Sequence, residues 1–389
     1  MAITAFLVPF AAFLVGGFLT SSYSDGLLLP FVGLVVPRLI DTMNRASNDP
    51  KWWDDSIRLL ACGTGTPIPD KTRASQCMLV AAGGEFLLFD TGDGSAENLM
   101  GYGIPFQNLS GIFFTHYHSD HIADFGEVVL GRWLRGGSTP LDVYGPPGIE
   151  RISEAYQQAY YLDSTYRIAH HGAENLPPEG RKTVPHKIEL CGTEYEEREA
   201  ASQHCTLESR GKVVLDRNGV QVTAFLVHHE PARPAYGYRV DYKGRSVTIS
   251  GDTVPCEELI HYAKDTDLLV HDAINHEVVQ YLSDLYKARG DRFGDRLGHM
   301  FGDILDYHSN PNQAINNAAD ANVTLLVLTH MVPPRRNAVI RRFSRIGWGT
   351  KGARNAHWKG EFVEADDGML WTLKPLPSKE IDQSYVVNN

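Results

Sequence analysis

The chain has 389 residues, enough to bury a large core as one big domain or two small ones. Hydrophobic residues make up 43% and charged residues 21%, which is the composition of an ordinary globular protein. The formal charge of −11 argues against a nucleic-acid partner, because phosphate binding normally shows as a basic surface. The five cysteines include no C-x-x-C pair and show neither a zinc-finger pattern nor a clear disulfide framework, so the redox compartment stays open.

Residues 1–50 form a hydrophobic N-terminal segment. Its two apolar runs, residues 4–19 and 27–40, are each shorter than the roughly 20 residues that span a bilayer. Three interpretations remain: an export signal or uncleaved anchor, a membrane-surface or hairpin attachment, and a soluble packing arm. We favour the first two and expect an exported or membrane-associated protein, with a cytoplasmic location as the alternative.

Residues 51–389 have the pattern of one folded domain. Short apolar strands are predicted over residues 57–61, 78–82, 85–90 and 109–115, and helices over residues 96–101 and 122–133. Gly83 and Gly84 separate two of these strands and predict a hairpin. Strands and helices thus alternate as an α/β sandwich requires.

Four potential metal ligands follow the strand over residues 109–115: His116, His118, Asp120 and His121. His116 and His118 are two apart, so on an extended segment their imidazoles point the same way. Asp120 and His121 come at the next turn, where the chain can direct them towards a second point close by. Imidazole suits zinc and a carboxylate is a common partner, so this H-x-H-x-D-H segment predicts a metal site.

The second half of the chain continues the alternation. Strands are predicted over residues 141–144, 220–227, 246–249, 267–270 and 325–328, a helix over residues 149–161, and a closing hairpin over residues 360–373. The polar segment over residues 163–212 has little periodicity and is predicted to be a long insertion over one face. Its histidines are expected at the surface rather than in a metal site; they are His170, His171, His186 and His204.

The H-x-H-x-D-H segment after an apolar strand resembles the metallo-β-lactamase superfamily of binuclear metallohydrolases. The resemblance continues in V-H-H-E-P-A-R-P-A-Y-G-Y-R from Val227, S-G-D-T from Ser250 and T-H-M from Thr329. It covers roughly residues 57–373. It implies an αββα metallo-β-lactamase sandwich of the α/β class, with the long insertion and the hydrophobic N-terminal segment as additions.

The resemblance also implies two metal ions, for which we expect Zn²⁺, with Mn²⁺ and Fe²⁺ as alternatives. One ion would be held by His116, His118 and His229, the other by Asp120, His121 and His330, with Asp252 bridging them. Spacing alone does not separate His229 from its neighbour His228. Asp90, in F-D-T-G-D-G, resembles the turn with which the family supports its metal loop.

Catalysis at such a centre needs an acid for the leaving group. In ribonuclease Z members, a Glu in one loop orients a His in another loop as the proton donor. The similar segments here are H-D-A from His271 and H-S-N from His308. The resemblance therefore assigns His308 as general acid, Asp272 as the residue that orients it and Asp120 as a further catalytic residue, although Asp in place of Glu shortens the orienting side chain.

S-G-D-T, H-D-A and P-A-Y-G-Y-R resemble the ribonuclease Z and arylsulfatase-like branch. The Gly/Pro/Lys-rich arm with which ribonuclease Z chains grip tRNA is missing between Arg239 and Ser246. This absence and the acidic charge favour an arylsulfatase-like zinc hydrolase that uses a metal-bridged hydroxide to cleave sulfate or phosphate esters. The alternative is a ribonuclease Z-type tRNA 3′-processing endonuclease, followed by a lactonase or a non-catalytic metal-stabilised scaffold.

The expected partners follow from these interpretations. They are a small anionic ester as substrate, tRNA under the alternative, a membrane contacted through residues 1–40, and a second copy of the chain in a homodimer.

Overall fold

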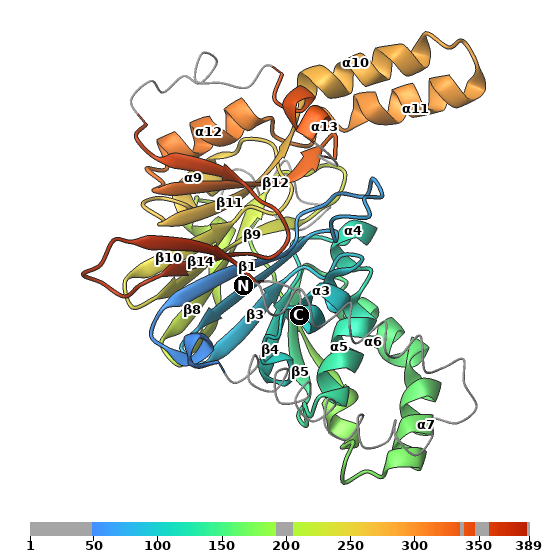
Figure 1. The fold of residues 1–389 in the computed structure, drawn as a ribbon, viewed down its shortest axis with the longest axis vertical. Helices are drawn as coiled ribbons and strands as arrows, with labels where there is room; N and C mark the ends of the chain where they lie inside the picture. The colour runs from blue at the N-terminus through green and yellow to red at the C-terminus, as the bar shows by residue number, and fades with distance from the viewer. Residues whose placement is uncertain (1–48, 192–204, 335–337, 347–357, 387–389) are drawn as a thin grey trace, which may run out of the picture. The chain divides into compact units, whose positions relative to one another are not determined.

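Two mixed β-sheets pack face to face (Figure 1). The computed structural model describes residues 49–191, 205–334, 338–346 and 358–386. Sheet A has eight strands, in the spatial order β15 (Ile381–Tyr385), β14 (Met369–Leu373), β1 (Ile57–Gly63), β2 (Cys77–Ala82), β3 (Glu85–Phe89), β4 (Leu109–Phe113), β5 (Leu141–Gly145) and β6 (Thr183–Lys187). Sheet B has seven, in the order β13 (Glu361–Glu364), β12 (Leu325–Val332), β11 (Leu268–Ile274), β10 (Arg245–Ile249), β9 (Ala235–Tyr242), β8 (Val220–Val227) and β7 (Gly211–Arg217).

A hydrophobic core fills the space between the sheets. Along β1, Ile57, Leu59 and Ala61 face this core, whereas Leu60 and Cys62 face the helices on the other side. Successive side chains of a strand point to opposite faces, so β1 and β2 are buried on both faces. Strands buried in this way read as continuous apolar runs, which is why short runs were sufficient to locate them.

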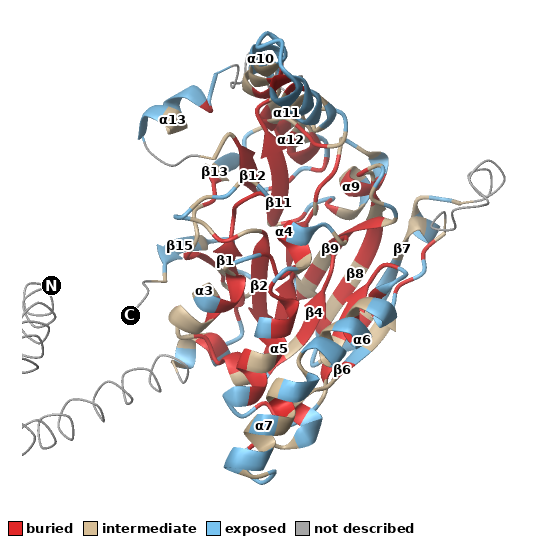
Figure 2. Cartoon of the chain, turned by 90° about the vertical axis from the view of Figure 1, so that its right-hand side faces the viewer, coloured by how far each residue is buried: buried red, intermediate tan, exposed pale blue. Residues whose placement is uncertain are grey.

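Helices cover the outer face of each sheet. α3 (Ser95–Gly101), α5 (Phe125–Leu134) and α6 (Ile149–Ala159) pack on sheet A, and α9 (Glu257–Tyr262) and α12 (Pro311–Asp320) pack on sheet B. Figure 2 shows the buried strands beneath these helices. The mixed α/β sandwich with two sheets that the sequence predicts is therefore confirmed. The remaining short helices are η1 (Pro50–Trp53), η2 (Phe106–Asn108), α4 (Ser119–Ile122), η3 (Pro178–Arg181), η4 (Glu208–Arg210) and α13 (Ala338–Phe343).

The hydrophobic N-terminal segment expected at residues 1–50 lies outside the described residues, except for Asp49 and Pro50. Pro50–Asn389 forms one compact unit by its internal contacts. In the part of the chain that the structure describes, no helix is long and apolar enough to cross a membrane.

The closing hairpin predicted over residues 360–373 is wrong. β13 pairs with β12 in sheet B, and β14 pairs with β1 in sheet A. The chain therefore crosses from one sheet to the other between these two strands. The alternation of a strand shows which face is apolar, but it carries no information on which strand is its partner.

The range 163–212, expected to be an insertion, contains most of α7 (Tyr161–His171), all of an edge strand of sheet A and the first two residues of an edge strand of sheet B. β6 pairs in parallel with β5, and β7, which begins at Gly211, pairs with β8. Edge strands are open on one side, so most of their side chains are not buried and an apolar pattern is missing. Residues 192–204 of this range lie outside the described residues.

α10 (His276–Lys287) and α11 (Arg292–Asp303) lie side by side as a helical hairpin that projects beyond the sheets (Figure 1). The side chains of Asn275 and Asp291 accept backbone N–H bonds at the two helix starts, at 3.0 and 2.6 Å. The helices approach closely at Gly298, where an added Cβ would lie 2.8 Å from the Ser283 carbonyl oxygen.

Candidate metal centre

The side chains predicted as ligands come together from loops and strand ends of both sheets. The loop after β4 and helix α4 supply four of them, and β8, β10 and β12 lead to one each. They are His116, His118, Asp120, His121, His229, Asp252 and His330. All are buried except His118, which is exposed.

Three histidines form the first group. His116 Nε2 lies 2.9 Å from His118 Nδ1, and His229 Nε2 lies 3.3 Å from the same atom. The Nδ1–H of His229 donates to the carbonyl oxygen of Tyr307 at 2.8 Å, so its lone pair is at Nε2, facing the other two rings. Three ring nitrogens thus face one another as the ligands of one cation do.

Asp120, His121 and His330 form the second group. His330 Nε2 lies 3.1 Å from Asp120 Oδ2, and His121 Nε2 lies 3.6 Å from the same oxygen. All three side chains are buried. A carboxylate with two imidazoles is a second set of donors for a divalent cation.

Asp252 lies between the two groups. Its Oδ2 is 3.2 Å from His121 Nε2 and 3.4 Å from His330 Nε2. The same oxygen is 3.9 Å from the Nε2 atoms of both His116 and His229. One carboxylate oxygen therefore contacts both groups, which is the position that a bridging ligand requires.

Asp90 supports the metal loop from the adjacent strand end. Its Oδ1 accepts the Thr115 N–H at 2.8 Å, and its Oδ2 accepts the Thr115 hydroxyl at 2.9 Å and lies 2.8 Å from His121 Nδ1. At Gly92, two residues on, an added Cβ would lie 2.2 Å from the Asp120 carbonyl oxygen, so only glycine fits. His121 is thereby held with its Nε2 towards Asp120 and Asp252.

The structure brings His229, and not His228, into the cluster. His228 Nε2 lies 3.4 Å from Glu258 Oε1, and its side chain is 41% exposed. Neighbouring residues of an extended segment point to opposite sides, so only one of the pair can face the other histidines. The choice is made by the orientation of β8 in its sheet.

The histidines expected at the surface lie away from the cluster where they are described. His170 and His171 are exposed, and His186 Nε2 lies 2.8 Å from Asp142 Oδ1. His204 lies outside the described residues.

His308 lies beside the cluster and contacts Asp272. His308 Nδ1 is 3.0 Å from one carboxylate oxygen of Asp272, and His271 Nδ1 is 3.0 Å from the other. The Asn317 side-chain amide donates to His271 Nε2 at 3.0 Å, which leaves the proton of His271 on Nδ1. Burial favours the protonated form of Asp272, but hydrogen bonds from His271 and His308 outweigh it and hold the pKa of Asp272 below its ordinary value.

The protonation states around the cluster fit divalent cations. Burial lowers the pKa of His229 to about 4 and the pKa of His116 well below its ordinary value, so both imidazoles are neutral and present lone pairs. Burial opposes ionisation of Asp252, but the nearby His330 and His121 hold its pKa well below the ordinary range. In the second group, burial disfavours the charged forms of His121 and His330, but the surrounding carboxylates outweigh it and raise the pKa of both, so this space attracts positive charge. Lone pairs in the first group and ionised carboxylates around the same space are donors for divalent cations.

A cleft of about 440 Å³ opens above the cluster. Asp252, His308 and His330 are among the residues of its floor. Its walls are apolar, with Ile68 from the loop after β1 on one side and Met300 from α11 on another. Polar chemistry at the floor is therefore surrounded by side chains that exclude water.

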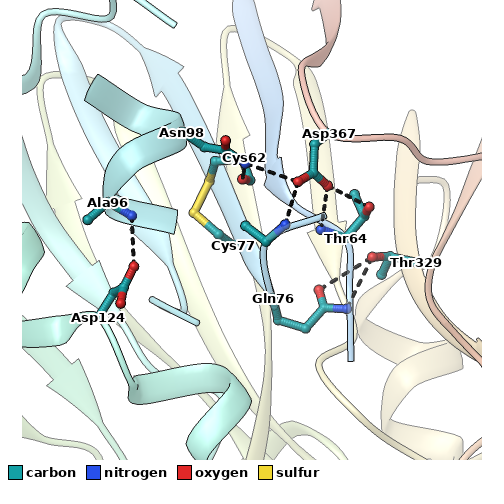
Figure 3. Close-up of a disulfide and its surroundings, with 10 residues drawn as sticks. Cys62, Thr64, Gln76, Cys77, Ala96, Asn98, Asp124, Thr329 and Asp367 are labelled. Atoms are coloured by element: carbon teal, nitrogen blue, oxygen red, sulfur yellow. Dashed lines mark hydrogen bonds between the residues drawn. A yellow bond between two sulfur atoms is a disulfide. The ribbon is translucent and has the colours of Figure 1, made fainter. Parts of the chain in front are cut away.

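A disulfide and a half-buried carboxylate hold the loop at the edge of this cleft (Figure 3). Cys62 of β1 is bonded to Cys77 of β2. Asp367 accepts the backbone N–H groups of Thr64 at 2.9 Å and Ala74 at 2.7 Å. The loop over residues 64–75 is thus tied at both ends.

A second disulfide joins Cys191 to Cys205, and Cys256 remains a free thiol. The sequence did not reveal either pairing, because cysteine spacing does not show which residues the fold brings together.

Some residues of the site carried no assigned role in the sequence. His271 opens the H-D-A segment but carried no role of its own; it meets Asn317 only because α12 packs on β11, and no local motif marks Asn317. The cleft wall did have a signal: Leu297, Met300 and Ile304 recur at helical spacing on one face.

Comparison with known proteins places this geometry in context. A family model described as Beta-lactamase superfamily domain matches residues 87–331. The chain is 36% identical over 280 residues to a protein named Ribonuclease Z from Mycobacterium avium (strain 104), covering 71% of this chain and 86% of that protein. It is 35% identical over 280 residues to Ribonuclease Z from Mycolicibacterium gilvum (strain PYR-GCK), covering 71% and 85%.

Solved structures show the same fold at lower identity. The short form of human tRNase Z superposes with a TM-score of 0.54 at 22% identity, covering 80% of this chain and 98% of that one. The metallo-beta-lactamase fold protein YhfI from Bacillus subtilis superposes with a TM-score of 0.52 at 19% identity, covering 82% and 100%.

These relatives correct the activity preferred from the sequence. Arylsulfatase-like cleavage of small sulfate or phosphate esters is wrong, because the curated relatives at about 35% identity are named Ribonuclease Z. The preference depended on a missing arm and on the net charge. Both describe the periphery of the molecule, and neither reports on the chemistry at the ends of the strands.

Proposed function

This chain belongs to the ribonuclease Z branch of the metallo-β-lactamase superfamily and is a metal-dependent hydrolase acting on ester bonds, and from that premise we propose that it is a tRNA 3′-processing endonuclease with two Zn²⁺ ions. The names of its curated relatives support the activity. The observation that carries the proposal is the position of His308, paired with Asp272 beside a buried His/Asp cluster.

The candidate ligands are divided between two metal ions. We assign one ion to the first group and one to the second, with Asp252 shared; the first group is His116, His118 and His229, and the second is Asp120, His121 and His330. When bound, the ions would lower the pKa of water and neutralise charge on the phosphoryl oxygens. Imidazole-rich sites with carboxylates suit zinc, and Mn²⁺ and Fe²⁺ are the alternatives that metal analysis distinguishes.

His308 supplies the proton for the leaving oxygen. Its Nδ1 faces the Asp272 carboxylate, which orients the ring and leaves Nε2 to carry the transferable proton. Because His271 and Asn317 hold the other side of Asp272, the carboxylate keeps its orientation when His308 loses its proton.

The test is single-nucleotide mapping of the products from a 3′-extended precursor tRNA and the zinc-loaded protein. We expect one cut after the discriminator base, lost on chelation and restored by zinc. His229→Ala and His228→Ala form a matched pair: the first should abolish cleavage and lose metal, and the second should retain both. Intact tRNA in the presence of two bound zinc ions would refute the proposal.

The sequence also led to expectations about a small substrate, a homodimer, membrane contact and export. The small anionic ester is no longer expected as the substrate, because the arylsulfatase-like activity on which it depended is wrong. A homodimer, membrane contact through residues 1–40, and export all stay predictions. The two disulfides favour an oxidising compartment, whereas the proposed tRNA substrate requires a location inside the cell, so the redox state of the cysteines tests both. Thiol labelling in the host cell, without reductant and after denaturation, should then modify only Cys256.

A further inference from the structure

An apolar stripe leads from the cleft along α11 towards the tip of the helical hairpin. Phe293, Leu297, Met300 and Ile304 recur every three or four residues and therefore share one face. Leu297, Met300 and Ile304 line the cleft, while Phe293 is 59% and Met300 52% exposed. At 1.5 Å per helical residue, the stripe is about 16 Å long, and Phe293 continues it about 6 Å beyond Leu297 of the cleft.

Two arginines run along one edge of this stripe. Arg292 and Arg296 are exposed, and neither has an ion-pair or hydrogen-bond partner among the described residues. The nearest acidic residue on that edge, Asp303, lies 3.4 Å from His299. Asp295 follows Arg292 by three residues and is its neighbour on the helix surface, away from the stripe. The edge therefore offers two guanidinium groups that form no ion pair or hydrogen bond within the described part of the chain.

We propose that this α11 face, made of Phe293, Leu297, Met300, Arg292 and Arg296, binds an unpaired segment of the substrate RNA. The bases lie on the apolar stripe and the phosphates contact the arginines. Single-stranded nucleic acid is bound by this combination, in which apolar or aromatic side chains take the bases and cations follow the backbone. The inference rests on the proposed function and names the part of the RNA that adjoins the scissile bond.

The α11 face adjoins the cleft above the metal centre, and this position favours RNA over other occupants. A strand whose phosphodiester lies at Asp252 and His308 must leave the cleft, and the α11 face forms a wall of that exit. A second copy of the chain would need an interface of some 20–30 residues on each side, far more than one narrow stripe. The unpartnered arginines match phosphate charge, which an apolar protein partner lacks.

Binding is measured with a fluorescein-labelled, 12-nucleotide single-stranded RNA and, in parallel, a blunt RNA hairpin. The zinc-loaded His308→Ala protein is the parent, so that RNA is not consumed. Phe293→Ala with Met300→Ala should weaken single-strand binding about tenfold or more. Arg292→Gln with Arg296→Gln should lower the slope of log Kd against log salt by about 1.4, or 0.7 for each phosphate contact.

Matched controls sit outside the α11 face. Tyr281→Ala with Leu285→Ala removes two exposed apolar side chains of α10, and Arg151→Gln removes an exposed charge of α6; both should bind RNA like the parent. Metal content and melting temperature identify a variant that has lost its fold. In that case Phe293→Ala alone, at the most exposed position of the stripe, provides the decisive measurement.

The outcomes separate this inference from the proposed function. Precursor tRNA cleaved by the wild type, with unchanged RNA affinity in the α11 variants, would overturn the inference and leave the function standing. No RNA cleavage by the zinc-loaded wild type would overturn both. A dimer that dissociates in the Phe293 and Met300 variants, seen by sedimentation, would show that a second copy occupies the stripe and would also overturn the inference.

Discussion

The floor and the wall of the cleft are built in opposite ways. The floor is buried at Asp252 and His330, which are at most 3% exposed, and each of these side chains is held at a strand end of the central sandwich. The wall is α11, on a hairpin that projects from the sheets and exposes half or more of Met300 and Phe293 (Figure 1).

The buried floor of the cleft therefore suits the chemistry, and the exposed wall suits recognition of the substrate. Donor atoms of a metal centre need positions fixed to a fraction of an ångström, and neighbouring strand ends provide that precision. Side chains that only contact the substrate can sit on a peripheral element, where they change without disturbing the donors. Variants at the floor should therefore abolish turnover, and variants at the wall should change affinity.

The largest effect is expected for Asp252→Ala, which removes a candidate metal ligand from the floor of the cleft. Loss of the shared ligand should remove at least one metal ion and lower kcat/KM by about 10³-fold or more, since metal ions contribute several kcal/mol of charge stabilisation. Metal analysis and steady-state kinetics on precursor tRNA measure this. A variant that keeps two ions and full activity would show that Asp252 is not a ligand.

His308→Ala should remove the proton donor and leave the metal content intact. We expect kcat on RNA to fall by about 10²–10⁴-fold. The loss should be much smaller with bis(p-nitrophenyl) phosphate, because its leaving group departs without a proton. Equal losses on the two substrates would mean that His308 acts in some other way.

Gly298→Ala should disturb the packing of α11, which forms the wall of the cleft, and should leave the metal ligands in place. Its added Cβ would lie 2.8 Å from the Ser283 carbonyl oxygen, so α10 and α11 must separate. We expect a destabilisation of about 1–3 kcal/mol and weaker RNA binding, with unchanged metal content. Gly302→Ala is the control, because its Cβ meets the Ser283 hydroxyl at 3.4 Å and alanine favours helix. Thermal unfolding with metal analysis should separate the two, and a stabilised Gly298→Ala would contradict the close packing.

Glu85→Gln should have the smallest effect, at the end of β3 away from Asp90. Arg217 of sheet B donates two hydrogen bonds to Glu85, at 2.9 and 2.7 Å. Burial favours the neutral acid, but the bonds from Arg217 outweigh it and hold the pKa of Glu85 below its ordinary value. A lowered pKa contributes stability above the unfolded value of about 4.3, and this stability is lost as pH falls through the folded pKa.

Arg217 is 40% exposed, so solvent screening limits the expected contribution to about 1 kcal/mol. Urea unfolding should show the wild type more stable than Glu85→Gln at pH 7, with the difference shrinking as the pH falls below the unfolded value of about 4.3. Turnover should be equal in the two proteins. A difference that grows on acidification would mean that the pKa of Glu85 is raised.

Local patterns could be predicted and long-range pairings could not. The strands that end at Phe89 and Phe113 are continuous apolar runs, and the H-x-H-x-D-H segment directly follows one of them, so both features are visible in a few neighbouring residues. The hairpin predicted over residues 360–373 failed because its two strands pair with partners far away in sequence. The net charge misled the choice of substrate, because it sums the whole surface and says nothing of one cleft.

By itself the sequence determined where most strands of a metal-dependent hydrolase lie along the chain and which candidate donors follow them, because apolar periodicity and motif spacing are properties of adjacent residues. The tertiary structure alone decided that His229 rather than His228 faces the other donors, that Cys62 pairs with Cys77, and that α11 forms the cleft wall. These three facts depend on which distant segments pack together. That packing is set by the burial of the whole core, and no short stretch of sequence contains it.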